Sequence, residues 1–453
     1  MARVFGTDGV RGIANVDLTP ELAFGVGRAG AFVLADDADP MRPFVIGRDT
    51  RLSGTMLEAA VVAGITSIGR DTISVGIVPT PAIARIVTSI GALGGVMISA
   101  SHNPIEDNGL KFVGADGFKL DDATEREIER VLADDSEVPR ASHDGIGLAK
   151  RSHGLVDRYF MNVIEAGGDL SPLTVVVDAA FGAAYEIGPR VLAALGATVV
   201  ALHAEDDGSR INVDCGSTNL APLQARVREL TAADKAAHVV GVAFDGDADR
   251  ALFVDEDGNA LSGDHVMLAL AVQKKKLGRL ARDTLVATVM SNVGLERALK
   301  DEGIALLRAA VGDRYVLEMM RAGGYNLGGE QSGHLIDLDR NTTGDGPLTA
   351  VMLFSLVVAA KTTLRALTAA MHVYPQILLN VRTNRKDVID SDAVRAAIAR
   401  VDAALGSDGR LLVRASGTEP LVRVMIEGDD RARIERLAAE VAETVERAAQ
   451  QPA

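Results

Sequence analysis

Cysteine is almost absent from this sequence of 453 residues, because Cys215 is the only one. A single cysteine cannot form an internal disulfide, and it cannot build a cysteine-based zinc site. Basic residues are also in deficit: 47 lysines and arginines stand against 62 aspartates and glutamates, a formal net charge of −15. A general nucleic-acid binder needs a broad basic face, so this class is disfavoured. A small phosphorylated substrate needs only a few well-placed cations and is not excluded.

Long apolar segments are missing as well. Residues 1–8 lack the apolar core of a signal peptide, and the stretch 347–360 is interrupted by Thr349 and Ser355 and too short to span a bilayer. The composition, 47% hydrophobic and 24% charged, is that of an ordinary globular protein and disfavours disorder or a fibrous structure. We therefore expect a soluble cytoplasmic protein with no membrane segment.

Predicted strands alternate with predicted helices along most of the chain. At roughly 150 residues per domain, the length suggests about three or four domains. Strands are predicted at residues 43–47, 173–178, 198–202, 284–289 and 305–309, and helices at 185–195, at 294–301 and after Ser53, a candidate N-cap. Apolar strands separated by helices indicate sheets that are covered on both faces, and hence α/β architecture.

The last part of the chain has a different order of elements. The pattern predicts a strand at 376–383, a helix at 391–405, strands at 410–414 and 421–427, and a helix at 431–449. This β-α-β-β-α order is typical of a compact α+β unit. Candidate boundaries lie at 142–154, 255–259 and 372–375, so we expect domains at residues 1–153, 154–255, 256–370 and 371–453.

The sharpest local pattern is DGDADR at residues 245–250, directly after an apolar strand. In extended backbone alternate residues point to one side, so Asp245, Asp247 and Asp249 are expected to converge. Three like charges on one face repel, and a hard divalent cation such as Mg²⁺ relieves the repulsion. A solvated acidic turn is the alternative. A calcium-binding EF-hand is excluded, since Arg250 stands where its loop needs glycine.

A second pattern, SASHNP at residues 99–104, follows another apolar stretch. A strand that ends in such a turn presents hydroxyl, imidazole and amide groups close together. On the chemical interpretation one serine is a nucleophile or a phosphate carrier. The alternative is a simple turn, since serine, asparagine and proline all favour turns. Neither serine lies in a Gly-x-Ser-x-Gly elbow, which disfavours an α/β-hydrolase.

Two further segments combine glycine with polar side chains. GGEQSGH at residues 328–334 places a carboxylate, a hydroxyl and an imidazole between glycines, which favours a loop close to a polyhydroxy ligand. An ordinary loop histidine is the alternative there. RASGTEP at residues 414–420, with Arg423 just beyond it, offers backbone N–H groups, hydroxyls and arginines to an anion such as phosphate. A plain β-turn is the alternative for this segment.

One familiar nucleotide-binding string is misleading here. Residues 25–30 fit Gly-x-Gly-x-x-Gly, but they follow a helix start, with Thr19 as N-cap and Pro20 at the first helical position, rather than a strand. We expect the glycines to lie inside a helix, where small residues permit close packing. No dinucleotide site is implied.

Taken together, the four polar segments resemble those of the α-D-phosphohexomutase superfamily, most closely its phosphoglucosamine mutase branch. The resemblance begins with FGTDGVRG at residues 5–12, keeps the family order and spacing, and covers the whole chain. It implies an α/β fold of three similar α/β domains with mixed sheets plus a smaller C-terminal α+β domain, around a central cleft.

The resemblance also implies roles for individual residues. Ser101 would be the phosphoserine that donates and recovers a phosphoryl group. One Mg²⁺ per active site would be held by Ser101, Asp245, Asp247 and Asp249. The remaining catalytic candidates are Arg11, His102, Lys111 and His334. Of these, Arg11, Lys111 and His334 match positions associated with charge stabilisation and proton transfer. Substrate-binding candidates are Arg250, Glu330, Ser332, Arg414, Ser416, Gly417, Thr418 and Arg423.

The reaction implied by the resemblance interconverts glucosamine 6-phosphate and glucosamine 1-phosphate through a glucosamine 1,6-bisphosphate, which is both intermediate and activator. Its product would feed UDP-N-acetylglucosamine and cell-wall precursor synthesis. Three carboxylates, a phosphoserine and one Mg²⁺ leave the site at a charge of about −3, so an anionic sugar needs the cations Arg11, Lys111 and Arg250 nearby.

Other functions remain open from the sequence. A phosphoglucomutase or phosphomannomutase of the same superfamily would share the chemistry, and a Mg-dependent sugar phosphatase could use the same aspartates. A non-catalytic sugar-phosphate sensor is disfavoured, since it has no need of Ser101 beside three aspartates. The expected partner is a small phosphosugar, with no nucleic acid and no membrane, and the sequence is compatible with a homodimer.

Overall fold

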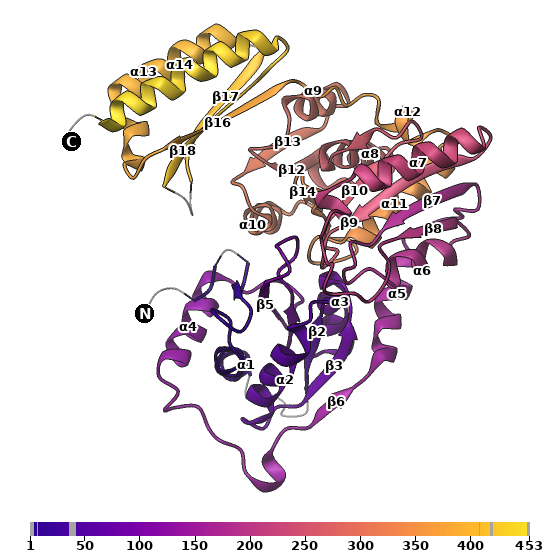
Figure 1. Ribbon diagram of the computed structural model, residues 1–453, viewed down its shortest axis with the longest axis vertical. Helices are drawn as coiled ribbons and strands as arrows, with labels where there is room; N and C mark the ends of the chain where they lie inside the picture. Colours follow the sequence, from indigo (N-terminus) through magenta and orange to yellow (C-terminus); the bar gives the residue numbers. More distant parts are fainter. Residues whose placement is uncertain (1–3, 7, 36–41, 407, 417–419, 451–453) are drawn as a thin grey trace. The chain divides into compact units, whose positions relative to one another are not determined.

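The computed structural model describes residues 4–6, 8–35, 42–406, 408–416 and 420–450. Its internal contacts divide the chain into two units, one of Met1–Val289 with Leu306–Ala369 and the other of Met290–Ala305 with Ala370–Ala453. The first contains three mixed sheets with most of their helices, and the second contains an antiparallel sheet and also helix α9 (Val293–Asp301) (Figure 1).

The first sheet has the strand order β1-β5-β4-β2-β3-β6. Its centre is parallel, because β2 pairs with β3 and β4 in parallel, whereas β5 pairs antiparallel with β4 and β1. Helices α1, α2 and α3 contact its strands (Figure 1). The elements are β1 (Val10–Ile13), α1 (Pro20–Leu34), β2 (Phe44–Arg48), α2 (Gly54–Thr66), β3 (Thr72–Ile77), α3 (Thr80–Ile90), β4 (Gly94–Ile98), β5 (Asp107–Gly114), α4 (Asp122–Ala133) and β6 (Ala149–Arg151).

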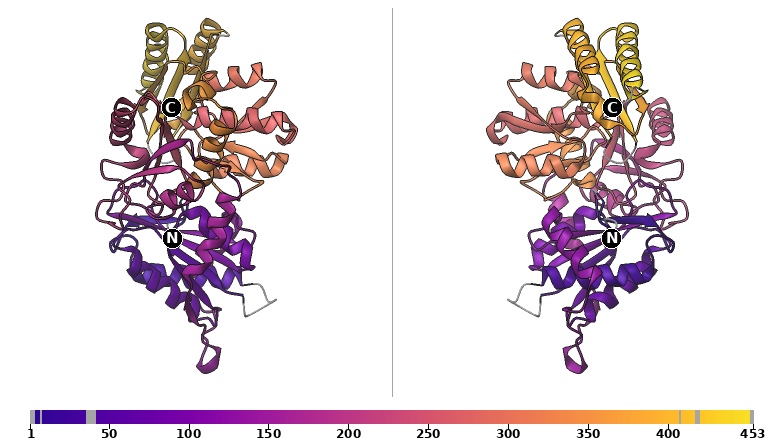
Figure 2. Two further views of the ribbon diagram at one scale, coloured as in Figure 1. Left: turned by 90° about the vertical axis from the view of Figure 1, so that its right-hand side faces the viewer. Right: turned by 90° about the vertical axis from the view of Figure 1, so that its left-hand side faces the viewer.

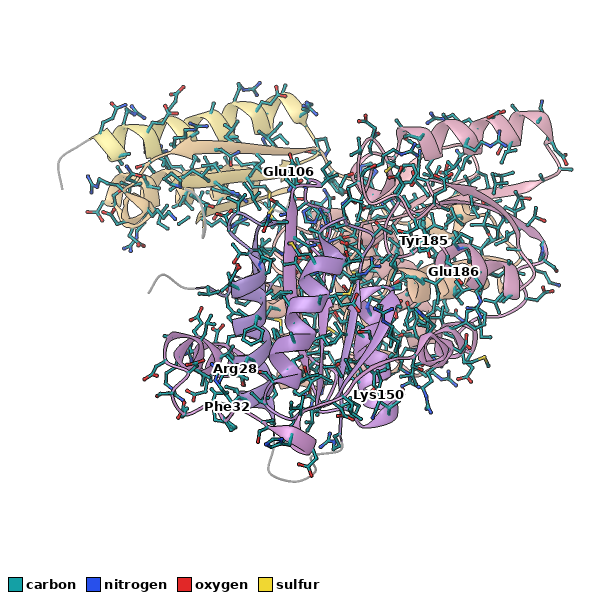
Figure 3. All side chains as sticks on the ribbon, turned by 60° about the horizontal axis from the view of Figure 1, so that its bottom comes forward. Arg28, Phe32, Glu106, Lys150, Tyr185 and Glu186 are labelled. Carbon is teal, nitrogen blue, oxygen red and sulfur yellow. The ribbon has the colours of Figure 1, made fainter. Side chains whose placement is uncertain are left out.

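The glycine-rich string lies inside α1, as the sequence predicts. Thr19 caps the helix by accepting a hydrogen bond from the Leu22 N–H, and the glycines let α1 approach its neighbours. A Cβ on Gly27 would stand 2.9 Å from the Val61 carbonyl oxygen of α2. Arg28 and Phe32 follow on the same helix (Figure 3).

The prediction for the start of α2 needs a correction. Ser53 occupies the N-cap position, but its side chain makes no capping hydrogen bond. Its hydroxyl instead accepts a hydrogen bond from the Asn108 side chain of β5, at 2.9 Å. A tertiary partner has therefore replaced the local one that the sequence pattern indicates.

The second sheet has the order β11-β10-β9-β7-β8. Strands β7 and β8 coincide with the predicted ranges, whereas the helix predicted at 185–195 is shorter and begins at Ile187. Strands β9 and β10 are antiparallel neighbours joined by the DGDADR loop. The elements are α5 (Val156–Ile164), β7 (Leu173–Asp178), α6 (Ile187–Ala194), β8 (Thr198–Leu202), α7 (Ala221–Ala233), β9 (His238–Phe244), β10 (Ala251–Val254) and β11 (Ala260–Leu261).

The third sheet has the order β13-β12-β14-β15, and β14 brings the GGEQSGH segment to its carboxyl end. Among the described residues no helix combines the length and hydropathy of a bilayer-spanning segment; the apolar stretch 347–360 forms most of α11. The elements are α8 (Gly263–Lys276), β12 (Thr284–Thr288), α9 (Val293–Asp301), β13 (Ala305–Ala309), α10 (Asp313–Gly323), β14 (Leu327–Gly329), β15 (Leu335–Asp337), α11 (Gly346–Ala359) and α12 (Leu364–Thr368).

The second unit contains the predicted α+β fold. Its sheet has the order β16-β18-β17 and is antiparallel throughout, and α13 and α14 lie side by side over it (Figures 1 and 2). Buried valines and isoleucines such as Val401, Val424 and Ile434 fill the space between helices and strands. The elements are β16 (Gln376–Arg382), α13 (Asp392–Leu405), β17 (Gly409–Ala415), β18 (Leu421–Gly428) and α14 (Arg431–Gln450).

We predict that Gly64→Ala destabilises the protein through the contact of α1 with α2. Its new Cβ would stand 2.3 Å from the Phe24 carbonyl oxygen, a backbone atom that cannot move away cheaply. Overpacking of this kind costs about 1–3 kcal/mol, which outweighs the gain of about 1 kcal/mol from better helix propensity. Thermal unfolding measures the effect. In the control Gly25→Ala the methyl meets only the end of the Leu132 side chain, so its stability should be unchanged or higher. A Gly64→Ala melting temperature at or above that of the wild type would contradict the prediction.

Candidate active site

The SASHNP and DGDADR segments meet at Ser101. The serine lies in the turn after β4 with a positive φ of 54°, and only 2% of it is exposed. Its hydroxyl donates a hydrogen bond to Asp245 Oδ2 at 2.7 Å, across 144 residues of sequence. The Nδ1 atom of His102 lies 3.3 Å from the same hydroxyl and 3.2 Å from Arg250 Nη1. A hydroxyl is thus held against a carboxylate and beside an imidazole.

The three aspartates of the β9–β10 loop converge as expected, but through a different backbone. Ligand atoms of Asp245, Asp247 and Asp249 lie within 4.8 Å of one another, and all three residues are buried. The prediction of extended backbone was wrong: the segment is a tight turn, in which Ala248 has a φ of 55°. The turn, rather than strand alternation, brings the carboxylates together.

Crowding of these carboxylates separates their pKa values. Burial and then the neighbouring charges of Asp249 and Asp247 raise the pKa of Asp245 to about 8. Burial also acts on Asp249, but His334 and Lys111 outweigh it and hold its pKa below the ordinary value. Near neutral pH the cluster therefore keeps a proton on Asp245.

Lys111 of β5 is the cation closest to the cluster. Its Nζ lies 2.7 Å from Asp247 Oδ2, 3.0 Å from Asp8 Oδ2 and 3.8 Å from Asp249 Oδ2. Burial alone would favour the neutral amine, but Asp247 and Asp8 prevail and raise the pKa of Lys111 above its ordinary value. The lysine is therefore a fixed positive charge beside three carboxylates.

A cavity of about 410 Å³ opens beside this cluster. Glu330 is oriented in it by the Gly312 N–H, which donates to its Oε1 at 3.1 Å, and the Ser332 hydroxyl lies 3.4 Å from its Oε2. The lining combines cations with acceptors suited to sugar hydroxyls and phosphate. The residues predicted from the sequence that line it are Arg11, His102, Asp249, Arg250, Glu330 and His334.

The sequence-based prediction gives no role to three charged residues of the site, which are Asp8, Lys119 and Asp313. Lys119 donates to Asp8 at 2.6 Å and to Asp313, and Asp313 lies 3.5 Å from His334 Nε2. Asp249 and then Asp313 overcome the effect of burial and raise the pKa of His334. Asp8 stands inside the FGTDGVRG segment, so that motif could have identified it, whereas nothing local marks Lys119 or Asp313.

Comparison with known proteins shows which family the chain belongs to. Models of the phosphoglucomutase/phosphomannomutase family match in four parts: alpha/beta/alpha domains I, II and III at residues 2–139, 157–258 and 262–374, and the C-terminal domain at 378–444. The phosphoglucosamine mutase of Thermoanaerobacter pseudethanolicus is 50% identical over 99% of both chains. The chain belongs to the phosphoglucosamine mutase family.

Other relatives support the same family and fold. The phosphoglucosamine mutase of Symbiobacterium thermophilum is also 50% identical, over 98% of this chain and 99% of the relative. Among solved structures, a phosphoglucomutase/phosphomannomutase family protein from Burkholderia thailandensis superposes with a TM-score of 0.83 at 26% identity, covering 100% of this chain and 98% of that one. The protein is therefore an enzyme, an isomerase built from three α/β domains with mixed sheets plus a C-terminal domain with an antiparallel sheet.

The donor set of the mutase fits a hard divalent cation. Asp247 Oδ1 is buried and accepts no hydrogen bond from any residue that the structure describes, so an oxygen ligand is available. Three carboxylates within 4.8 Å of one another are the oxygen-rich environment that Mg²⁺ prefers. The cluster could therefore hold a metal ion.

The second unit of the mutase holds the RASGTEP segment. Arg414 on β17 and Arg423 on β18 are directly opposite in the antiparallel register. Burial and the charge of Arg423 lower the pKa of Arg414, and like charges facing each other favour an anion between them. The Ser416 N–H donates to the Leu421 carbonyl, and the Ser416 carbonyl accepts from Lys386. Gly417 and Thr418 lie outside the described residues.

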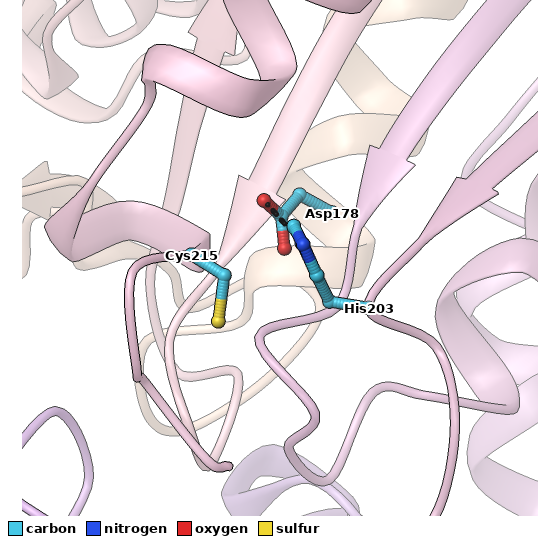
Figure 4. Close-up of side chains that lie close together, drawn as sticks. All are labelled: Asp178, His203 and Cys215. Atoms are coloured by element: carbon cyan, nitrogen blue, oxygen red, sulfur yellow. Dashed lines mark ion pairs between the residues drawn. The ribbon is translucent and has the colours of Figure 1, made fainter.

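A second polar cluster of the mutase lies at the carboxyl end of β7 and in the segment after β8 (Figure 4). Ligand-type atoms of Asp178, His203 and Cys215 lie within 4.8 Å of one another. His203 Nδ1 is 3.1 Å from Asp178 Oδ2, and Asp178 Oδ1 accepts from the Ala180 N–H. Burial raises the pKa of the Cys215 thiol to about 12, so the thiol stays neutral. The cluster therefore places an imidazole beside a buried carboxylate and a neutral thiol.

We predict that Mg²⁺ binding to the unphosphorylated mutase releases about one proton near pH 7. A pKa of about 8 means that Asp245 is protonated at that pH, and a metal ligand must lose its proton. Titration with Mg²⁺ in weakly buffered solution with a pH indicator measures the release. Near pH 9 the carboxyl is already ionised, so the same titration should release much less. Metal binding with equal proton release at both pH values would contradict the assignment of the proton to Asp245.

Proposed function

We propose that this enzyme interconverts glucosamine 6-phosphate and glucosamine 1-phosphate through a phosphorylated Ser101 and a glucosamine 1,6-bisphosphate. The observation that carries the proposal is the buried Ser101 hydroxyl, held 2.7 Å from Asp245 in a cluster of three carboxylates. The reaction moves a phosphoryl group from Ser101 to the sugar 1-hydroxyl. The bisphosphate then turns over, and its 6-phosphate returns to Ser101.

One Mg²⁺ per active site would be held by Asp245, Asp247, Asp249 and a phosphate oxygen on Ser101. When bound, it supplies positive charge that stabilises the transferring phosphoryl group. Lys111 provides a second, permanent positive charge at 2.7 Å from Asp247. Positioning and charge neutralisation together account for most of the catalysis expected of phosphoryl transfer.

The cations of the cavity receive the anionic substrate. Arg11 and Arg250 line the cavity with His102, whose pKa is lowered to about 4 by burial and by the charges of Arg250 and Arg11. A neutral His102 accepts a hydrogen bond from Arg250 and leaves that guanidinium directed at the site. His334 lies between Asp249 and Asp313 and is the candidate for moving protons to and from the sugar hydroxyl.

Recognition of the sugar is assigned to Glu330 and Ser332, whose carboxylate and hydroxyl lie together on one loop. The phosphate that is not being transferred is assigned to the facing arginines Arg414 and Arg423. Ser416, Gly417 and Thr418 complete this phosphate-binding segment. These roles follow from the chemistry of each group, since fixed arginines match phosphate oxygens and carboxylates accept from sugar hydroxyls.

We propose that the chain has four domains, each of which carries one loop with a role in the reaction. The domains proposed are residues 1–153 with the phosphoserine loop, 154–255 with the metal loop, 256–370 with the sugar loop, and 371–453 with the phosphate loop.

The enzyme would act in the cytoplasm on a free phosphosugar, and its product would feed UDP-N-acetylglucosamine and cell-wall precursor synthesis. A homodimer stays a prediction.

A ³¹P NMR time course tests the function. With Mg²⁺ and a trace of 1,6-bisphosphate, glucosamine 6-phosphate should be converted to the 1-phosphate faster than glucose 6-phosphate is, by about tenfold or more. That factor is what one hydrogen bond from a charged amino group contributes. A modest rate with the glucose ester is expected, because only one substituent differs.

The other outcomes of that time course separate the alternatives. A higher catalytic efficiency on glucose or mannose phosphate would overturn the glucosamine assignment and leave the mutase chemistry. Inorganic phosphate released in proportion to substrate, without any 1-phosphate, would mean a sugar phosphatase.

A further inference from the structure

Arg51 is a buried arginine that the reaction scheme above does not use. It lies in the loop between β2 and α2, and its side chain is 0% exposed. A buried guanidinium is stable only when its donors are satisfied, and it has five N–H groups to place. The hydrogen-bond partners of these donors therefore indicate the structural role of Arg51.

All five donors of Arg51 are used, and four of them hold one short segment. Nε donates to Asp49 Oδ2 at 3.0 Å. The remaining four N–H groups go to backbone carbonyl oxygens of the phosphoserine segment and of the residues that follow it. These are the carbonyls of Ser101 at 3.0 Å, Asn103 at 2.9 Å, Asp107 at 3.0 Å, and Pro104.

The other side of the Ser101 peptide is held by the same group of residues. Asp49 accepts from the Arg51 backbone N–H at 2.9 Å and from the Ser99 hydroxyl at 2.6 Å. The Ser99 hydroxyl in turn accepts from the Ser101 N–H at 2.9 Å. Both the N–H and the C=O of Ser101 are thus tied to the Asp49–Arg51 pair, which is fully buried.

The backbone of Ser101 needs such support. A positive φ in a residue other than glycine costs of the order of 1 kcal/mol or more and persists only where surrounding contacts impose it. Asn212, from the domain that carries the metal loop, adds hydrogen bonds to the carbonyls of Ser101 at 2.9 Å and Asn103 at 3.3 Å. A Cβ on Gly246 would stand 2.4 Å from the Ser101 carbonyl oxygen, so the metal loop also closes against this peptide.

We propose that Arg51 is a positioning residue for phosphoryl transfer. Its guanidinium fixes the turn at Ser101 to Asp107, so that the Oγ atom of Ser101 keeps one position beside Asp245 in both halves of the reaction cycle. This inference rests on the proposed role of Ser101 as phosphoryl carrier. Arg51 acts through the backbone of Ser101 and does not reach the substrate cavity, so it is expected to affect transfer rather than sugar binding.

Arg51→Lys is the direct test. Lysine keeps the charge but has only three donors from one atom, so it cannot hold four carbonyls and Asp49 together. We expect kcat to fall about tenfold to hundredfold, since a displacement of about 1 Å costs this much, while KM for the sugar phosphate stays nearly constant. The ³¹P resonance of the phosphoserine, recorded without substrate, should broaden or split as the turn loses its single conformation.

Arg28→Lys is the matched control. Arg28 of α1 is also buried, at 4% exposure, and its guanidinium likewise pairs with a carboxylate, Asp135, and donates to a backbone carbonyl, that of Val138 at 2.9 Å. The same exchange there should lower thermal stability and leave kcat unchanged. Arg51→Lys with the kcat of wild type or of the control would overturn the proposal, as would a KM that rises by the factor expected for kcat.

A second variant decides the question if Arg51→Lys does not fold. Asn212→Asp keeps the shape of a half-buried side chain but puts a carboxylate oxygen against the carbonyl of Ser101, the atom that Arg51 also holds. It should lower kcat with little change in KM and broaden the phosphoserine resonance, and an unchanged kcat would contradict the proposal. A wild-type protein without mutase turnover would instead contradict the proposed function.

Discussion

Repulsion among the three buried carboxylates of the β9–β10 loop is the constraint on which the rest of the site depends. Asp245, Asp247 and Asp249 lie within 4.8 Å of one another, in a turn between two buried strands that cannot move apart. Without compensation such a cluster would be costly, because buried charges lose their hydration. The structure compensates with a raised pKa of Asp245, which favours its neutral form, with Lys111 at 2.7 Å from Asp247, and with a geometry suited to a divalent cation.

The compensating charges form a continuous alternating chain. Lys111 contacts Asp8, Asp8 contacts Lys119, Lys119 contacts Asp313, and Asp313 lies beside His334. Each cation therefore contacts at least two carboxylates, and a change at one position shifts the charge balance at the next. This explains how a protein with a formal net charge of −15 can present a local surface suited to a phosphosugar.

Much of the fold follows from local pattern, and so does half of the site. Strands β7, β8 and β13 have the predicted bounds because uninterrupted apolar runs between turns define them. The three aspartates were predicted to converge because they alternate in a polar segment directly after an apolar strand. The choice of Ser101 among the two serines of SASHNP came from the family resemblance instead. Ser53 shows the limit of such reasoning, since Asn108 takes the hydroxyl that a local cap would use.

Apart from Asp8, which lies in the FGTDGVRG segment, the residues that sequence reasoning missed are single charges without a local pattern. Arg51 holds carbonyls 50 to 56 residues away, and Lys119 reaches Asp313 across 194 residues, so only the folded chain brings these partners together. The turn at Ala248 is likewise a product of the strand pairing on either side of it.

The central claim is that Ser101 carries the phosphoryl group, and mass spectrometry of the intact enzyme tests it most directly. After incubation with Mg²⁺ and glucosamine 1,6-bisphosphate, the protein should gain the mass of one phosphoryl group, located on the peptide that contains Ser101. Adding glucosamine 6-phosphate should remove that group and produce bisphosphate, and Ser101→Ala should remain unmodified and inactive although folded. A phosphoryl group on another residue, or turnover at the wild-type rate by Ser101→Ala, would contradict the account.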